Sequence, residues 1–281
     1  MVTLVEDYLA IRRRLGFALR IQGYQLLRFA RFADDIGHRG PLTLQLAVQW
    51  ARWNAPRPVT WATRIDMLRP FARYRAQFDP ATEIPPRNLL GTCHRRLVPH
   101  IYSAQEIQSL LAAAAQLLPV GGLRPATYET LFGLLAVTVM RISEALHLTL
   151  QDVELEAGII TVRETKFRKS RLIPLHPTTT QALQRYAHLR DTLVPTPPSD
   201  DFFLSDGGRR MLQDTVERLF RRLCDQLGWR SRGGHPVPRI QDLRHSFITH
   251  CLLRWYQQGI NVDNEMLALS TYVGHAEITY T

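Results

Sequence analysis

Residues 131–141 read LFGLLAVTVMR, an almost continuous apolar run that ends in an arginine. A segment that is apolar nearly all round predicts a helix buried inside a hydrophobic core. The guanidinium at its end needs a partner, because an unpaired buried charge is strongly destabilising. Glu144 stands three residues beyond Arg141, so both side chains fall on one face of a helical turn. Spacing alone fits a structural ion pair as well as a functional site.

The segments that surround this run predict helices around a small antiparallel sheet. Residues 159–164 and 170–175 are strand-like segments that flank a short turn, which predicts a β-hairpin. Pro174 places the second strand toward an edge. Ser103, with Glu106 three residues later, is a capping-box pattern that begins a helix. Further helices are expected over residues 178–189, 213–227, 242–257 and 265–272.

The first part of the chain predicts four helices between residues 3 and 78, with Thr43 placed to cap the third. Residues 79–102 show little periodicity and contain four prolines. We therefore expect a mainly α protein with a small antiparallel β-sheet or hairpin, built as two domains. They are a helical N-terminal domain over 1–90 and an α+β domain over 103–281, joined by a linker over 91–102.

The charge is unevenly distributed along the chain. The net charge is +10, and residues 1–95 hold 15 Arg against 7 Asp and Glu, a difference of +8. Such a surplus favours a polyanionic partner, because neutralising phosphates releases condensed counterions. RNA or an anionic lipid surface would also fit the charge alone. The arginines predicted to contact phosphate in this region are Arg12, Arg13, Arg14, Arg64, Arg69 and Arg73.

Several classes of protein are disfavoured by what the sequence lacks. It has no glycine-rich phosphate loop, no HExxH or GxSxG motif, and no tight acidic cluster for two metal ions. Its three cysteines are widely spaced and form no CxxC pair. No apolar run is long enough to cross a bilayer, and the N-terminus is acidic where a signal peptide is basic. We expect a soluble intracellular protein with no metal or cofactor and no membrane association.

Four segments, in this order, resemble the motif boxes of the tyrosine recombinases, the phage-type integrases. Residues 138–146 resemble the first arginine box, 165–175 the lysine hairpin, 240–247 the second arginine box, and 269–275 the box before the nucleophile. The basic helical domain that precedes them fits the core-binding domain of this family. The resemblance therefore covers essentially the whole chain, and it suggests an integrase-like or transposon-type member.

The resemblance implies an enzyme that breaks and rejoins DNA strands through a 3′-phosphotyrosyl intermediate, without metal or ATP. Arg141 and Arg244 would hold the non-bridging phosphate oxygens, and Glu144 would orient Arg141. Lys166 would donate a proton to the leaving 5′-oxygen, and His275 would contact the phosphate or the attacking oxygen. Gln241, Arg244 and His245 are predicted to lie on a different face of their helix from its inward-facing residues, which are Leu243, Phe247, Cys251 and Trp255.

The same resemblance implies double-stranded DNA as the partner and a homo-oligomer assembled on DNA by the full-length protein. It implies a role in DNA recombination, integration or transposition of a mobile element, in the cytoplasm of a bacterium and associated with the nucleoid. Arg168 and Lys169 of the hairpin would add DNA contacts. The chain has only two lysines, Lys166 and Lys169, against 33 arginines.

Three positions depart from the family pattern. Gln241 stands where histidine or lysine is usual, and an amide cannot exchange a proton near neutral pH. Val139 replaces a glycine. The nucleophilic tyrosine is expected about nine residues beyond His275, near position 284, so we expect the 281 residues to lack the usual nucleophile segment. Tyr280 is the one tyrosine after the last box, at a spacing that does not fit the nucleophile.

Two alternatives to a recombinase remain open at this stage. The first is a non-catalytic DNA-binding protein built on the same scaffold. The second is an enzyme like the type IB topoisomerases, which use similar residues, although the compact helical N-terminal domain disfavours it. The set of two arginines and one lysine favours the recombinase, because binding alone does not require it.

Overall fold

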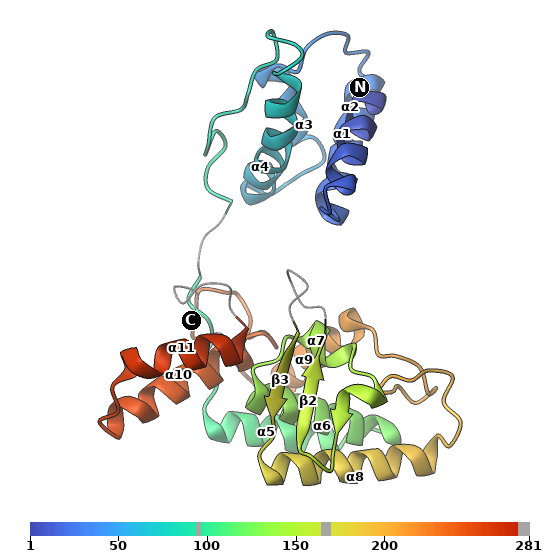
Figure 1. Ribbon diagram of the computed structural model, residues 1–281, viewed down its shortest axis with the longest axis vertical. Helices are drawn as coiled ribbons and strands as arrows, with labels where there is room; N and C mark the ends of the chain where they lie inside the picture. The colour runs from blue at the N-terminus through green and yellow to red at the C-terminus, as the bar shows by residue number, and fades with distance from the viewer. Residues whose placement is uncertain (94–96, 164–169, 275–281) are drawn as a thin grey trace. The chain divides into compact units, whose positions relative to one another are not determined.

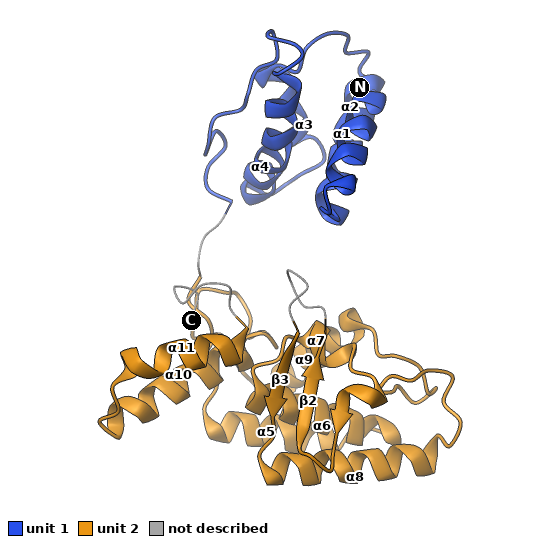
Figure 2. Cartoon of the chain, in the orientation of Figure 1, with its two compact units in different colours: residues 1–96 blue, residues 97–281 orange. Residues whose placement is uncertain are grey.

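The computed structural model describes residues 1–93, 97–163 and 170–274 (Figure 1). The chain divides into two compact units, residues 1–96 and 97–281 (Figure 2). Helices make up most of the described residues, with one small antiparallel sheet of short strands. The predicted fold class, mainly α with a small antiparallel sheet, is confirmed.

Unit 1 is a bundle of four helices, and each apolar face turns inward. Phe29, Trp50 and Phe71 are fully buried at its centre, and Phe29 meets the other two rings edge to face. Thr43 begins the third helix as predicted, since its hydroxyl accepts a hydrogen bond of 3.2 Å from the backbone N–H of Leu46. The helices are α1 (Val2–Arg14), α2 (Arg20–Asp35), α3 (Leu44–Arg52) and α4 (Pro58–Arg75).

Unit 2 is organised around α6 (Leu123–Thr138), which contains the apolar run. This helix contacts α5, α8 and α10, which explains why its sequence is apolar nearly all round (Figure 1). It ends directly before α7 (Ile142–Leu146), a single turn that begins after Arg141. The other helices of the unit are α5 (Ala104–Ala115), the 3₁₀ turn η1 (Leu150–Asp152), α8 (Pro177–Leu193), α9 (Gln213–Gln226), α10 (Asp242–Gln257) and α11 (Val262–Val273).

The sheet of unit 2 has the order β1-β2-β3, with every pair antiparallel. Its strands are β1 (Val153–Glu154), β2 (Ile159–Val162) and β3 (Arg171–Pro174). The predicted hairpin is confirmed, and β3 lies at an edge of the described sheet, as the proline indicated. Ile160 pairs with Ile173, and both side chains are fully buried. The two-residue strand β1 was not predicted, because it is too short to show alternation.

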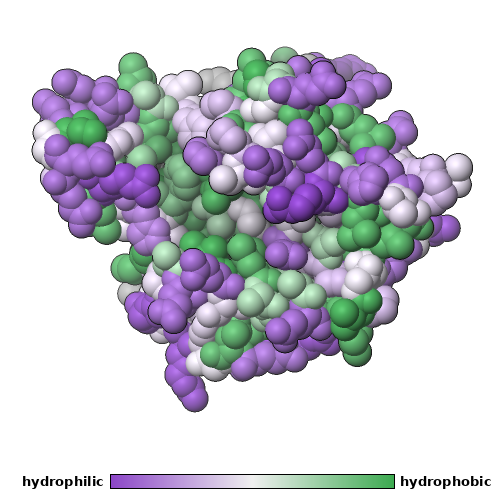
Figure 3. All heavy atoms as spheres, turned by 90° about the horizontal axis from the view of Figure 1, so that it is seen from below, coloured by the Kyte–Doolittle hydropathy of each residue, from purple (hydrophilic) through white to green (hydrophobic). Residues whose placement is uncertain are grey.

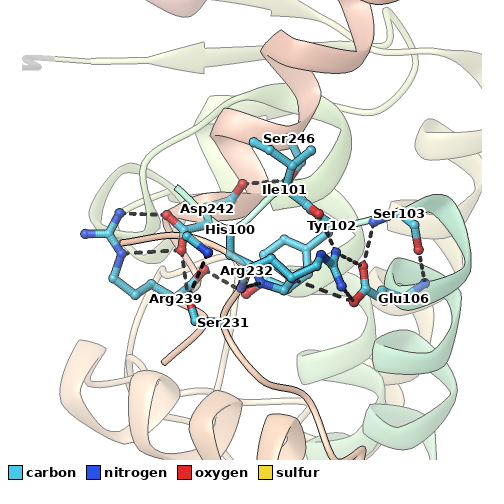
Figure 4. Close-up of polar contacts among 11 residues, drawn as sticks. His100, Ile101, Tyr102, Ser103, Glu106, Ser231, Arg232, Arg239, Asp242 and Ser246 are labelled. Atoms are coloured by element: carbon cyan, nitrogen blue, oxygen red, sulfur yellow. Dashed lines mark hydrogen bonds and ion pairs between the residues drawn. The ribbon is translucent and has the colours of Figure 1, made fainter. Parts of the chain in front are cut away.

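A hydrogen-bonded network fixes the beginning of unit 2 to α10 (Figure 4). Tyr102, which the sequence analysis placed in the linker, is fully buried. Its backbone N–H donates to Ser246 Oγ at 2.8 Å, and its hydroxyl donates to the carbonyl of Arg239 at 3.0 Å. The buried carboxylate of Asp242 accepts hydrogen bonds from Arg239, including one of 2.6 Å from Nη2. These contacts hold the first turn of the helix that carries Arg244.

The predicted capping box of α5 is also confirmed and extends into an ion pair. Ser103 Oγ accepts from the backbone N–H of Glu106, whose carboxylate accepts from the backbone N–H of Ser103 in return. The same carboxylate accepts two hydrogen bonds of 2.7 Å from Arg232. Hydrogen bonding to Arg232 lowers the pKa of Glu106 to about 2.

The depressed pKa of Glu106 predicts a specific dependence of stability on pH. Its stabilising effect should be complete above the unfolded-state pKa near 4.5 and should disappear as pH falls toward 2. In urea unfolding at pH 7 we expect Glu106→Gln to lower the free energy of unfolding by about 3 kcal/mol. The gap should close between pH 4.5 and 2, whereas Glu156→Gln, an exposed control, should behave like the unmodified protein at every pH. A gap that is constant with pH contradicts the assignment.

An apolar groove of 380 Å³ lies between α5, α6 and α8. Its walls include Leu111, Gly133 and Leu183. Figure 3, which views the molecule from below, shows apolar residues (green) around hollows in this face. The described lining includes neither Arg141 nor Arg244, so the groove is separate from these two predicted catalytic arginines. Among the described helices, none is both long and apolar enough to cross a membrane.

Candidate active site

The site begins where α6 ends, at a valine in an unusual conformation. Val139 has φ +49°, in the left-handed region that a β-branched residue rarely adopts. The left-handed conformation costs a residue with a side chain roughly 1–2 kcal/mol. Val139 is nevertheless fully buried, in a small cluster with Ile248, Leu269 and Val273. The glycine that the family resemblance led us to expect here would adopt this conformation without strain.

Arg244 lies inside unit 2, between the ends of α6 and α11. It is 3% exposed, and its two terminal nitrogens donate to the carbonyl of Val139 and, at 2.6 Å, to the carbonyl of Val273. The prediction that Arg244 sits on a separate face from the apolar residues of α10 was therefore wrong. Arg244 contacts Val139 and Val273, and Cys251 and Trp255 of the same helix pack against the small cluster that contains these two valines. Burial and the nearby charge of Arg141 lower the pKa of Arg244 to about 10, so it remains cationic at neutral pH.

Arg141 and Glu144 form the ion pair that their spacing predicted. Arg141 Nη1 donates to Glu144 Oε1 at 2.6 Å, and the backbone N–H of Arg141 donates to Oε2 at 2.9 Å. The carboxylate closes the first turn of α7 in this way and orients the arginine at the same time. The side chain of Arg141 is 30% exposed and that of Glu144 is 8% exposed. Part of the guanidinium therefore remains accessible to a ligand.

Arg171 forms an arginine cluster with Arg141 and Arg244 around Glu144, and no role was predicted for it from the sequence. From β3 it donates to Glu144 Oε2 at 2.7 Å. Burial acts to raise the pKa of Glu144, but the hydrogen bonds from Arg171 and Arg141 outweigh it and hold that pKa below its ordinary value. One signal could have revealed Arg171: it shares a strand face with the buried Ile173, and a charge on a core-facing position requires a partner.

Of the other predicted catalytic residues, Gln241 is the one that lies among the described residues. Gln241 lies at the N-terminus of α10 and is partly buried, one helical turn before Arg244. His245 is partly buried, and this burial lowers its pKa. The remaining predicted site residues, Lys166, Arg168, Lys169, His275 and Tyr280, lie outside the described residues. Within residues 1–93, 97–163 and 170–274, no group of three or more His, Cys, Asp or Glu is placed to bind a metal ion.

The six arginines predicted to contact DNA from unit 1 differ in accessibility. Arg13, Arg14 and Arg73 are exposed. Arg12 is partly buried, with its guanidinium carbon 3.9 Å from the centre of the Phe17 ring. These four remain candidates for phosphate contact.

Two arginines of that prediction are engaged within unit 1 instead. Arg64 is buried, and its Nη1 donates to the carbonyls of Trp50, Ala51 and Trp53 at the end of α3. Arg69 donates to the carbonyls of Pro85 and Pro86 and forms an ion pair of 2.6 Å with Asp66. Both satisfy backbone groups of the protein, so we withdraw them from the predicted DNA contacts.

Comparison with known proteins identifies the family. The sequence profile of the phage integrase family matches residues 101–281, more than half of the chain. The chain belongs to this family. The resemblance to tyrosine recombinases that the four segments indicated is thereby confirmed.

Two curated relatives of this integrase-family chain match it over nearly its full length. The Sinorhizobium fredii protein y4rB, provisionally named as an integrase/recombinase, is 41% identical over 285 residues, which covers 99% of this chain and 90% of y4rB. The tyrosine recombinase XerD of Listeria monocytogenes is 26% identical over 300 residues, which covers 100% of this chain and 93% of XerD.

Solved structures of the family share its fold. The Tn1549 transposon integrase, solved with a circular intermediate DNA, superposes with a TM-score of 0.70 at 21% identity, covering 100% of this chain and 93% of that one. The XerH site-specific recombinase, solved on its difH substrate after cleavage, gives a TM-score of 0.62 at 18% identity, covering 92% and 72%. At these identities the likeness shows that this integrase-family chain shares the fold of those proteins, and no more.

The strained valine gives a test of the site that needs no DNA. At Val139 a glycine variant should be more stable than an alanine variant by about 1 kcal/mol, because only glycine adopts a positive φ freely. Val216 is a matched control, since it is also fully buried but lies within α9. There the order should reverse, with alanine more stable than glycine by about 1 kcal/mol. The four variants are compared by chemical denaturation, and the same order at both positions contradicts the left-handed conformation.

Proposed function

We propose that this protein is a site-specific DNA strand transferase that recombines or integrates duplex DNA. The observation that supports it most directly is the charge of the arginine cluster. Among the described residues, Arg141 and Arg171 share one carboxylate, that of Glu144, and the hydrogen bonds of Arg244 go to two neutral backbone carbonyls. Within this described part of the chain, the three arginines therefore carry a surplus of positive charge in a largely buried setting, which an anion such as a phosphodiester would neutralise.

The proposed reaction is a transesterification at phosphorus. A tyrosine oxygen forms a bond to the phosphorus of a DNA phosphodiester, and the bond from phosphorus to the 5′-oxygen breaks. The tyrosine loses its proton and the leaving 5′-oxygen gains one. Because one phosphodiester bond replaces another, the reaction consumes no ATP. Attack by a 5′-hydroxyl on the phosphotyrosyl bond reverses the step on the same or another strand. The main task of the protein is to stabilise the charge that grows on the non-bridging oxygens.

Each predicted residue takes a role in this proposal. Arg141 and Arg244 hold the non-bridging oxygens, and Gln241 donates a hydrogen bond to the phosphate without exchanging a proton. Lys166 protonates the leaving oxygen, and His275 contacts the phosphate or the attacking oxygen. A tyrosine supplies the nucleophile; the family spacing favours a position about nine residues after His275, and Tyr280 remains the weaker candidate.

Structures of similar proteins that were solved with DNA support a DNA duplex as the partner of this chain. The Tn1549 integrase, XerH and a lambda integrase dimer were each solved bound to DNA. For this chain we infer that Arg13, Arg14 and Arg73 add backbone contacts from unit 1. We also infer a homo-oligomer on DNA, because exchange between two duplexes requires several strand cleavages and each needs a site. The place of action would be the nucleoid of a bacterial cytoplasm.

One experiment tests this function without knowledge of the target sequence. The full gene product is incubated with sheared genomic DNA from its source in EDTA and without ATP, and covalent complexes are trapped in denaturing detergent. We expect DNA attached through a tyrosine at recurring sequences; mass spectrometry identifies the tyrosine, and sequencing identifies the site. Duplex binding without any covalent complex would favour the non-catalytic alternative.

The salt dependence of binding tests the electrostatic part of the proposal. Affinity for a duplex that contains the recovered site should fall by about 10³ or more between 50 and 200 mM salt if six or more phosphates are contacted. Arg13→Ala combined with Arg14→Ala should reduce the slope of log affinity against log salt, because each lost phosphate contact lowers it by roughly one. A flat response to salt would contradict phosphate contacts from unit 1.

A further inference from the structure

The side chain of Arg171 contacts the arginine cluster from β3 and is 13% exposed. Its Nη2 donates to Glu144 Oε2 at 2.7 Å, and its Nη1 lies 3.3 Å from Oε1. Oε1 also accepts from Arg141 Nη1 at 2.6 Å. One carboxylate is thus shared by two guanidinium groups that come from different elements of unit 2.

The same guanidinium lies against the end of α11. Gly274 ends this helix with φ +73°, and a Cβ built there would stand 3.0 Å from Arg171 Nη1 and 3.2 Å from its Cζ. A side chain at this position would therefore both strain the backbone and press on the guanidinium. The close approach joins β3 to the backbone immediately before His275. Arg171 thus touches two of the segments that carry predicted catalytic residues.

The sharing of Glu144 has a chemical consequence for Arg141. A carboxylate that faced Arg141 alone could form a two-pronged pair with it and occupy the nitrogens that a phosphate would need. With Arg171 drawing on both oxygens, Glu144 holds Arg141 through one side-chain hydrogen bond and one backbone hydrogen bond. No other hydrogen bond to a described residue occupies the Arg141 fork, so the rest of it is left for a ligand.

We propose that Arg171 is a positioning residue for strand cleavage. Because it also pairs with Glu144, the carboxylate makes one side-chain hydrogen bond to Arg141, whose guanidinium is then oriented and still available to the scissile phosphate. Arg171 also supports the Gly274 turn at the end of α11. Arg171 is mostly enclosed by these contacts and acts through them without touching the phosphate. This inference rests on the proposed function.

The effect of Arg171 should appear in the cleavage step and not in binding. We expect Arg171→Ala to lower the single-turnover rate of cleavage at saturating protein by about 10–100-fold, by analogy with the loss seen when residues that orient metal ligands are replaced. Affinity for the duplex should change by less than about threefold. Arg171→Lys should recover part of the rate, because it restores the charge but not the paired hydrogen bonds.

The experiment uses the full gene product and a nicked duplex that contains the site recovered from covalent complexes. Arg163→Ala is the matched control, since Arg163 follows β2, is 61% exposed and pairs with Asp152 outside the cluster. The control should cleave at the rate of the unmodified protein. Glu144→Ala and the double variant Arg171→Ala with Glu144→Ala complete a cycle, and the losses should be strongly non-additive if Arg171 acts through Glu144.

Each outcome has a definite meaning. If Arg171→Ala cleaves as fast as the unmodified protein, this inference is overturned and the proposed function stands. A loss of rate in Arg171→Ala that matches its loss of affinity or of folded protein, measured by thermal unfolding, assigns Arg171 a structural role only. Additive losses in the cycle also overturn it. Failure of the unmodified protein to cleave any DNA would overturn the proposed function together with the inference.

Discussion

Replacement of Arg141 by alanine is expected to lower the rate of strand cleavage by about 10²–10³ while duplex affinity stays within a few-fold. A preorganised donor aimed at developing charge typically contributes this much to a rate. The other contacts proposed along the DNA backbone should sustain binding without it. The free energy of unfolding should change by less than about 1 kcal/mol, because the side chain is 30% exposed and Glu144 keeps its pairing with Arg171.

Three measurements on the same preparations separate these effects. Single-turnover cleavage of the nicked duplex gives the rate, a binding titration gives the affinity, and urea unfolding gives the stability. Arg141→Lys is the control for charge, and it should recover only a part of the rate because an ammonium lacks the planar fork. A parallel loss of binding and cleavage in Arg141→Ala would show that Arg141 has a structural role.

The second large effect is expected for Arg244→Ala, which should lose both cleavage and stability. We expect the cleavage rate to fall by at least about 10². The free energy of unfolding should fall by about 2–4 kcal/mol, because the carbonyls of Val139 and Val273 lose their donor in a buried place. The two arginines, although assigned the same chemical role, are thus distinguished by their effect on folding.

Arg254→Ala is the matched control for this change, since Arg254 is exposed on the same helix α10. Its cleavage rate and unfolding curve should coincide with those of the unmodified protein. Cleavage by Arg244→Ala is measured well below its unfolding midpoint, so that only folded protein contributes. If this variant is destabilised but cleaves at the original rate, Arg244 serves the fold alone.

Local sequence patterns predicted much of the fold. The capping residues Thr43 and Ser103, the apolar helix before Arg141 and the hairpin edge at Pro174 all agree with the structure. Each of these signals lies within one helical turn or one strand pair, where spacing and residue type determine the geometry. The pairing of Arg141 with Glu144 belongs to the same class, since only three residues separate the partners.

The destinations of long side chains could not be predicted in this way. Periodicity indicates which side of a helix turns toward the core but not where an arginine head group ends. Arg64 therefore resembled a phosphate contact, although it reaches the carbonyls at the end of α3. Arg171 joins Glu144 across 27 positions of sequence, and Arg244 joins Val139 across 105. Such meetings depend on the packing of whole elements, and so does the left-handed conformation of Val139.

The hydrogen bond between Tyr102 and Ser246 connects positions 144 residues apart and has a practical consequence for dissection of the protein. A catalytic fragment that began at Ser103 would expose the cavity left by a fully buried tyrosine and would leave the hydroxyl of Ser246 without this donor. The helix with Arg244 would then begin beside an unfilled hole. Expression of unit 2 by itself should accordingly start no later than Leu97, so that the first residues to enter the unit are retained as part of its core.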